Sequence, residues 1–264
     1  MKWDKKEKNR QIFQRAGAVL FALALWQFLA MRLNLNILLV SPVEVGARLL
    51  TIWREEGFFT SLWFTFYHIA GGFFLGLFLG IALAFLSSRF SLLEILLSPF
   101  LSAIKAVPVA SFVVICLIWL KASNLSVFIS FLIVFPVIYG NVLTGIKNLD
   151  KDLLEMADVF EIRGFYRLKG IILPLLAPYL LSAASVSCGM AWKAGVAAEI
   201  IGIPNGSIGK NLQQAKIYLD TDDLSAWTVI IVIVSAAFEK VFILLLKRIL
   251  GADRTIGKGG RDVA

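Results

Sequence analysis

One short segment of the sequence has the composition of a phosphate-binding loop. Gly206-Ser207-Ile208-Gly209-Lys210-Asn211 places two glycines beside a lysine and a side-chain amide. A phosphate loop also needs a glycine five residues before the second one, and a Ser or Thr after the lysine to hold magnesium. Here Pro204 and Asn211 stand at those two positions. We therefore interpret the segment as a turn that starts an amphipathic helix over 211–219.

The residue types used for metal binding and nucleophilic catalysis are few and scattered. Cys116 and Cys188 each lie in a hydrophobic stretch, with no Cys or His at the spacing of metal ligands. The single histidine, His68, also lies in an apolar run, without a nucleophile and base beside it. The sequence therefore predicts no catalytic group and no metal site, and it indicates inert core thiols.

Long apolar runs set the fold class. Of 264 residues, 59% are hydrophobic and 17% are charged, whereas soluble domains average about 45–50% and about 25%. Residues 63–86 and 125–146 contain 24 and 22 residues without a formal charge, and a bilayer core requires roughly 20. The composition predicts an all-α, polytopic membrane protein, and excludes a disordered chain and a disulfide scaffold.

Six spanning helices can be placed along the chain. We expect them at 16–31, 63–86, 99–120, 125–146, 177–198 and 226–246. They leave a basic N-terminus over 1–15, an external loop over 32–62, an internal loop over 147–174 and a tail over 249–264, with five spans forming a core over 63–248. Prolines 99, 108 and 136 predict kinks, and glycines 72, 76 and 80 predict close helix packing.

The positive charges predict the orientation. With the N-terminus inside, 17 Lys and Arg residues lie on the cytoplasmic side and 6 outside, which favours both termini in the cytoplasm. The net charge of +8 is thereby explained by topology, and no nucleic-acid partner is predicted.

Several ionisable residues fall inside the predicted spans. Lys193, next to Trp192 and near Met190, either lines a path and attracts an anionic solute or extends its stem to the outer interface. His68 is either a titratable group in the path or a hydrogen-bonded packing residue. Glu199, at the mouth of the fifth span, is expected to contact another protein chain rather than solute. Glu239 and Lys240 are expected to find partners on other helices.

The internal loop is amphipathic. Leu153, Leu154, Ala157 and Phe160 recur at helical spacing, with charged residues between them. Asp150 can cap this helix, Gly164 allows a break before a basic segment, and Pro174 opens the next span. The stretch 147–169 has five acidic and five basic residues, so it lacks the cationic bias of a helix on anionic lipid. Its apolar face therefore indicates a docking surface, with an interfacial helix as the alternative.

The same loop carries the resemblance to a known family. Glu155-Met156-Ala157-Asp158-Val159-Phe160-Glu161, nine residues, then Ile171-Ile172-Leu173-Pro174, resembles the EAA loop of binding-protein-dependent ABC importer permeases. In the family pattern an alanine stands at the position of Met156 and a glycine at the position of Glu161. We assign part of that glycine's role to Gly164. Trp26-Gln27, Ser41-Pro42, Gly72-Phe73, Lys105 to Pro108 and Ala198-Glu199 resemble the nitrate, sulfonate and taurine branch, although His68 stands where many members have arginine.

This resemblance implies a type I importer permease in the bacterial inner membrane. Implied partners are a second permease copy, two ATPase subunits that hold ATP and Mg²⁺, an external solute-binding protein and the bilayer; this chain itself binds no cofactor. The implied solute is small, and anionic or heteroaromatic. The ATPase-docking residues are then Glu155, Met156, Ala157, Asp158, Glu161, Gly164, Ile171, Leu173 and Pro174. Candidates for the path are Lys193, Met190, Trp192, His68 and Glu199.

Two other classes of function would need residues that this sequence largely lacks. A self-sufficient, ion-coupled secondary transporter needs mid-membrane carboxylates and usually an internal repeat, and Glu239 is the one mid-span acid. A membrane enzyme needs a nucleophile and a base at one face, which the sequence does not supply.

Overall fold

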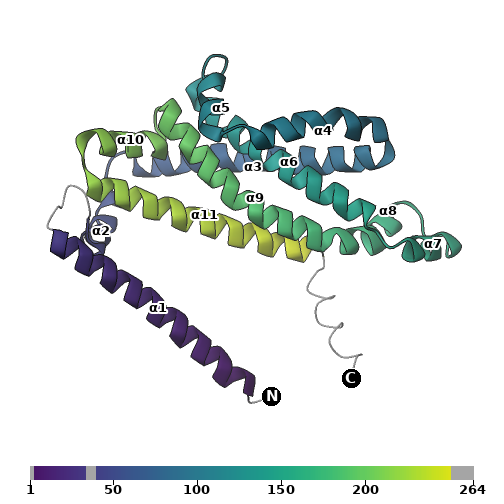
Figure 1. Cartoon of the computed structure of the whole chain (residues 1–264), viewed down its shortest axis with the longest axis horizontal. Helices are drawn as coiled ribbons and strands as arrows, with labels where there is room; N and C mark the ends of the chain where they lie inside the picture. The colour runs from purple at the N-terminus through teal and green to yellow at the C-terminus, as the bar shows by residue number, and fades with distance from the viewer. Residues whose placement is uncertain (1–2, 34–39, 251–264) are drawn as a thin grey trace. The chain divides into compact units, whose positions relative to one another are not determined.

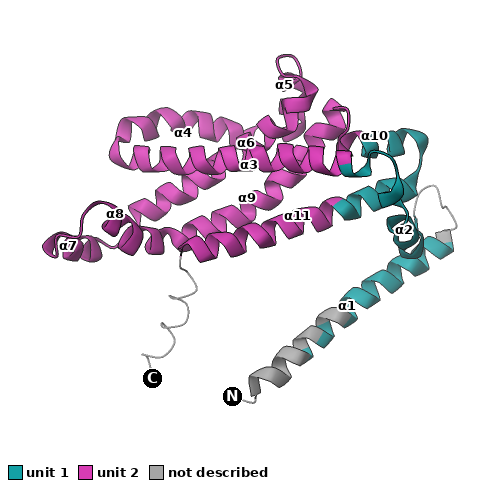
Figure 2. Cartoon of the chain, turned by 180° about the vertical axis from the view of Figure 1, so that it is seen from behind, with its two compact units in different colours: residues 1–59, 211–230 teal, residues 60–210, 231–264 magenta. Residues whose placement is uncertain are grey.

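The computed structural model describes residues 3–33 and 40–250, and within them it is built from helices. The chain forms two compact units, residues 1–59 with 211–230 and residues 60–210 with 231–264 (Figure 2). The helices are α1 (Trp3–Leu33), α2 (Pro42–Leu49), η1 (Ile52–Arg54), α3 (Phe58–Arg89), α4 (Ser91–Ala106), α5 (Val109–Cys116), α6 (Ala122–Lys147), α7 (Lys151–Val159), α8 (Gly164–Arg167), η2 (Leu168–Ile172), α9 (Leu173–Gly202), α10 (Ile208–Tyr218) and α11 (Thr221–Leu250). The predicted all-α class is confirmed.

Of the six expected spans, four are clear among the described residues, and most of these helices extend beyond the apolar runs. Four stretches are long and apolar enough to cross a bilayer: α3, α6, the stretch 164–202 that ends with α9, and α11. The pair α4 and α5 adds a fifth if it is one span, and α1 contains an apolar segment over 17–32. The second helix begins at Phe58 rather than at residue 63, and the predicted N-terminal segment and first span form the single helix α1. Helical hydrogen bonds continue past the apolar stretch, because they do not depend on lipid. The predicted tail lies almost entirely outside the described residues.

The third predicted span, 99–120, is two helices rather than one, and the kink predicted at Pro108 is confirmed as a break. Helix α4 ends at Ala106 and α5 begins at Val109, and the two are bent by 105°. Val107 at the break has an extended backbone, with φ −76° and ψ 130°, the conformation that a following proline imposes. Pro108 therefore breaks the helix, whereas Pro99 and Pro136 lie inside α4 and α6.

Close packing of α3 on α6 positions the core of the second unit. A Cβ on Gly72 would lie 2.2 Å from the Val127 carbonyl oxygen, and one on Gly76 would lie 2.8 Å from Cβ of Val134. The predicted glycine ridge is therefore confirmed as the place where the two helices meet. On its other side α6 packs along α9, and Figure 1 shows the two helices side by side. Cys116 and Cys188 are both buried and free, as predicted.

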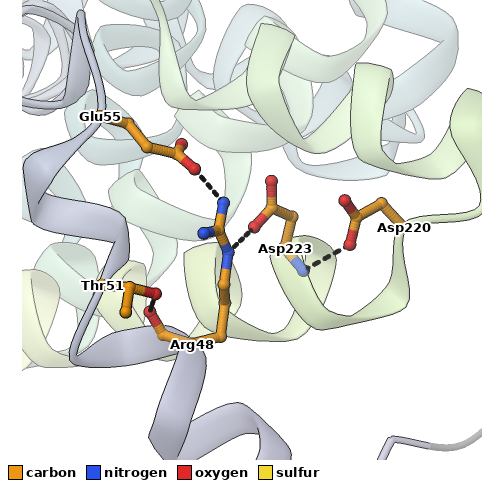
Figure 3. Close-up of polar contacts among 5 residues, drawn as sticks. All are labelled: Arg48, Thr51, Glu55, Asp220 and Asp223. Carbon is orange, nitrogen blue, oxygen red and sulfur yellow. Dashed lines mark hydrogen bonds and ion pairs between the residues drawn. The ribbon is translucent and has the colours of Figure 1, made fainter.

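The first unit contains a charged cluster formed by α2, η1 and α11 (Figure 3). Arg48 pairs with Glu55 and with Asp223. Asp220 accepts a hydrogen bond from the Asp223 backbone N–H at 3.1 Å, which caps the start of α11. The hydrogen bonds to Asp223 and Glu55 raise the pKa of the Arg48 guanidinium above its ordinary value. This cluster holds α2 against the first turn of α11.

Candidate functional site

The internal loop between α6 and α9 forms a short helix with a closed turn at each end. Asp150 accepts a hydrogen bond from the Asp152 N–H at 2.9 Å and begins α7, as predicted. At the other end the Ile162 N–H donates to the Ala157 carbonyl at 2.8 Å and the Glu161 N–H to Asp158 at 3.1 Å. This pair of bonds is a Schellman motif, which requires a left-handed residue between helix and exit.

Glu161 is the left-handed residue of that motif. Its φ is +53°, a conformation that costs a residue other than glycine roughly 1–2 kcal/mol. The turn thus keeps a glycine-like backbone although a glutamate occupies it. Gly164 has φ +58° and makes a second left-handed step before α8, so it supplements the turn at Glu161 and does not replace it.

The loop exposes two pairs of large apolar side chains, at 159–160 and 165–166. Val159 is 80% exposed, Phe160 70%, Phe165 67% and Tyr166 80%; these four residues are here called the aromatic surface. The predicted apolar face is corrected in part, because Ala157 is fully buried within the chain and only Phe160 of that face is fully exposed. Met156, at 44% exposure, extends the surface along α7.

The acidic residues of the loop have different environments. Asp158 pairs with Arg167 of α8, so its charge is compensated within the loop. Glu155 is exposed and makes no ion pair among the residues that the structure describes. It therefore remains available to a partner.

The loop leads directly into α9. One π-helical turn, η2, follows α8, and Pro174 lies in the first turn of α9, where no N–H is needed. Ile171, Leu173 and Pro174 are half-buried. Figure 1 shows α7 and α8 at the end of α9 where the helix begins, so the loop and α9 form one unbroken path of backbone.

The residues of α9 that are candidates for the translocation path differ in how far they are buried. Lys193 is exposed and Met190 is 44% exposed, whereas Trp192 is 2% exposed. The Trp192 ring packs against Phe66 and Phe238, with ring centroids 6.0 and 6.1 Å apart. The tryptophan is thus a packing residue, while Lys193 and Met190 lie on the surface of the chain.

His68 has the geometry of a packing residue. Its Nδ1 donates to the Phe64 carbonyl oxygen at 2.7 Å, and its ring stacks on Phe64 with centroids 4.0 Å apart. Because a carbonyl oxygen can only accept, Nδ1 carries the hydrogen. Of the two interpretations from the sequence, this arrangement favours the hydrogen-bonded one.

Glu199 lies in a buried junction of three helices. Its Oε2 accepts from Thr65 Oγ1 of α3 at 2.7 Å and from the Gly209 N–H of α10 at 3.3 Å, and Thr65 Oγ1 accepts from the Ile208 N–H at 3.0 Å. These four residues are here called the Glu199 junction. Glu199 is fully buried, so the expectation that it contacts another protein chain is wrong. The carboxyl group instead satisfies the Gly209 N–H at the start of α10, and Thr65, which donates to it, satisfies the Ile208 N–H.

Sequence reasoning missed the other members of this junction. Thr65 is fully buried, and nothing in its sequence context marks it. Gly209 is required because a Cβ there would lie 2.2 Å from Cβ of Glu199. Ser207 caps α10 by accepting from the Lys210 N–H at 3.0 Å, which a search for helix caps could have found.

Glu239 of α11 accepts a hydrogen bond from Ser185 of α9. The prediction that it finds a partner on another helix is confirmed. The carboxyl group is used in packing α9 against α11.

Comparison with known proteins identifies the chain. The family described as "Binding-protein-dependent transport system inner membrane component" matches residues 72–253, which include the internal loop, α9 and the Glu199 junction except Thr65. The chain belongs to this family. It is therefore a permease component of a transport system, a multi-pass protein of the inner membrane, and not itself an enzyme.

Relatives of this permease carry names from one group of transporters. A Bacillus subtilis (strain 168) protein named as an aliphatic sulfonates transport permease is 28% identical over 229 residues, 86% of this chain and 82% of its own. A nitrate import permease of Synechococcus elongatus is 24% identical over 77% of each chain. A bicarbonate transport system permease of Synechocystis is 26% identical over 56% of this chain and 53% of its own. The resemblance to the sulfonate and nitrate branch of ABC importer permeases is confirmed.

Proposed function

We propose that this permease forms the translocation path of an ATP-driven importer for a small anion. Two copies of the chain assemble with two separate ATPase subunits, which bind ATP and Mg²⁺, and an external binding protein delivers the solute. The names of the relatives support an anion, because aliphatic sulfonates, nitrate and bicarbonate all carry negative charge.

The aromatic surface of the internal loop supports the ATPase contact most directly. Four large apolar side chains that are 67–80% exposed, beside the exposed carboxylate of Glu155, have the composition of a protein interface. The charge count assigns this loop to the cytoplasm, where an ATPase has access to ATP. In the assembly the ATPase covers the aromatic surface, and the EAA loop residues from Glu155 to Pro174 frame the contact.

The continuity of the loop with α9 provides the route of coupling. When the ATPases approach each other on binding ATP, they draw the two internal loops together. Helix α9 follows, because only the π turn η2 separates it from α8, and the path opens outward to receive solute. Lys193, exposed on α9, is a candidate to contact the solute on this route.

A pair of matched valines tests the docking surface. Val159→Asp places a charge in the aromatic surface, and Val43→Asp makes the same change on α2, where the side chain is 69% exposed on the predicted external side. We expect Val159→Asp to abolish co-purification of the ATPase and uptake, while Val43→Asp retains the ATPase. Co-purification of the ATPase with the Val159→Asp chain at the wild-type ratio would show that this surface does not dock it.

A further inference from the structure

Lys105 places a positive charge at membrane depth. It lies in the last turn of α4, and its Nζ is 3.9 Å from the point where a Cβ on Gly140 of α6 would stand. Gly140 precedes Lys147, at the inner end of α6, by seven residues, or about 10 Å at 1.5 Å per residue. The ammonium group is therefore about one third of the way into a hydrocarbon core of about 30 Å. A charge at this depth faces water or polar protein rather than lipid.

The backbone beside Lys105 leads to the same conclusion independently. The chain is not helical between Ala106 and Val109, where α4 and α5 are bent by 105°, and Val107 there is 38% exposed. Irregular backbone at membrane depth is stable only where protein covers it or where it lines a water-filled cavity. An exposed break and an exposed cation one residue from the end of α4 thus face a common polar space.

Lys105 is also not neutralised by the residues that the structure describes. Among residues 40–250 it makes no ion pair and no hydrogen bond. Lys147 differs, because it pairs with Glu94 of α4 at 2.6 Å. Gly140 has no side chain that could accept a hydrogen bond from the ammonium group. The Nζ donors are therefore available to a mobile anion.

We propose that Lys105 binds the transported anion inside the translocation path, at the break between α4 and α5. This inference rests on the proposed function and makes it more specific: the ligand is a small oxyanion, either a sulfonate, nitrate or bicarbonate, with an oxygen that accepts from Nζ. Lys105 is a specificity residue of the path, distinct from Lys193 on α9.

Uptake by the complete reconstituted transporter, with its ATPase and binding protein, tests the proposal. Lys105→Met removes the charge and keeps the length, and Lys105→Arg keeps the charge. The matched control is Lys240→Met, since Lys240 is also exposed, and lies seven residues before Lys247 in α11. The probes are ethanesulfonate, nitrate and bicarbonate. The probe that the wild-type transporter accumulates identifies which of the three anions is the substrate.

We expect Lys105→Met to lower kcat/KM for that anion by about tenfold to a hundredfold, the loss associated with one charge-assisted hydrogen bond. Lys105→Arg is expected to retain most of the uptake, and Lys240→Met all of it, with the basal ATPase activity of the Lys240→Met transporter unchanged. Equal uptake by Lys105→Met and wild type, or an equal loss in Lys240→Met, would overturn the proposal.

Cysteine labelling gives a readout that does not depend on uptake. Lys105→Cys is made in the complete complex with Cys116 and Cys188 replaced by alanine, and treated with an anionic, membrane-impermeant thiosulfonate reagent. We expect rapid modification that the accumulated anion slows, and no such protection for Lys240→Cys. An unreactive Lys105→Cys contradicts the polar space. If wild type shows no ATP-dependent uptake of any probe, the proposed function fails; if only the Lys105 results fail, this inference alone does.

Discussion

Replacement of Glu199 tests whether the Glu199 junction holds the outer helix α10 in place. Glu199→Leu keeps a similar volume but removes the oxygen that accepts from Thr65 Oγ1 and from the Gly209 N–H. The Gly209 N–H is then buried without a partner, because Gly209 is itself buried. Leaving one buried donor unsatisfied costs about 1–3 kcal/mol. The Thr65 hydroxyl loses its acceptor as well, so we expect about 3 kcal/mol in total.

Hydrogen exchange of the first turn of α10 measures this loss where it occurs. If the amides of Ile208 and Gly209 exchange by local opening, about 3 kcal/mol corresponds to exchange faster by about a hundredfold. Glu199→Gln is the matched control, since its side-chain carbonyl can accept the same two hydrogen bonds; we expect its exchange to stay within about fivefold of wild type, given a difference below ~1 kcal/mol. Equal exchange rates in the leucine and glutamine variants would refute the assignment of the carboxyl group as the acceptor that holds α10.

Three further changes give distinct outcomes. Glu161→Gly relieves the left-handed backbone and should stabilise the internal loop by about 1 kcal/mol, seen as slower exchange of the Ile162 amide; faster exchange would show that the glutamate side chain stabilises the turn. Gly72→Ala places a Cβ 2.2 Å from a carbonyl oxygen of α6 and should destabilise the protein by about 3 kcal/mol or more, measured by thermal unfolding in detergent, whereas Gly71→Ala, with no neighbour within 4 Å, should not. The Ser41 N–H donates to Glu44 at 2.8 Å and lowers the pKa of that carboxyl below 4.5; the folded pKa is thus below the unfolded one, so this contribution is present above pH 4.5 and is lost as pH falls through the folded value. Exchange of the first α2 amides should show that acid-dependent loss in wild type and not in Glu44→Gln.

Features with a strong local signal were predictable from the sequence. Apolar runs of more than 20 residues have one stable outcome in a bilayer, and they correspond to α3 and α6. The glycine ridge on α3 and the cap at Asp150 follow rules of spacing that involve a single helix. The family of the EAA loop was also accessible, because its motif occupies contiguous positions.

The features that sequence reasoning missed depend on contacts between distant segments. Glu199 is separated from Thr65 by 134 positions and from Gly209 by 10, so its position near the end of an apolar run suggested a surface residue. In the sequence, Asp158 and Glu155 are both acidic residues of the same amphipathic helix. Only the fold shows that Arg167 pairs with Asp158. Pro99, Pro108 and Pro136 gave the same local signal, although only Pro108 breaks its helix. Local propensity does not distinguish a proline that neighbours accommodate from one that they do not.

The continuity of α9 has a mechanical consequence. This helix runs without interruption from Leu173, beside the internal loop, to Gly202, just beyond Glu199, a length of about 45 Å for 30 residues. A rod of that length, tilted by about 5° at its inner end, displaces its outer end by about 4 Å, close to one helical turn of 5.4 Å. The Glu199 junction lies at that outer end, where hydrogen bonds of 3.0 and 3.3 Å join it to the first residues of α10. A tilt of α9 would therefore move the start of α10 with it. Events on the two sides of the membrane therefore need no relay of side chains between them, because one piece of secondary structure reaches both.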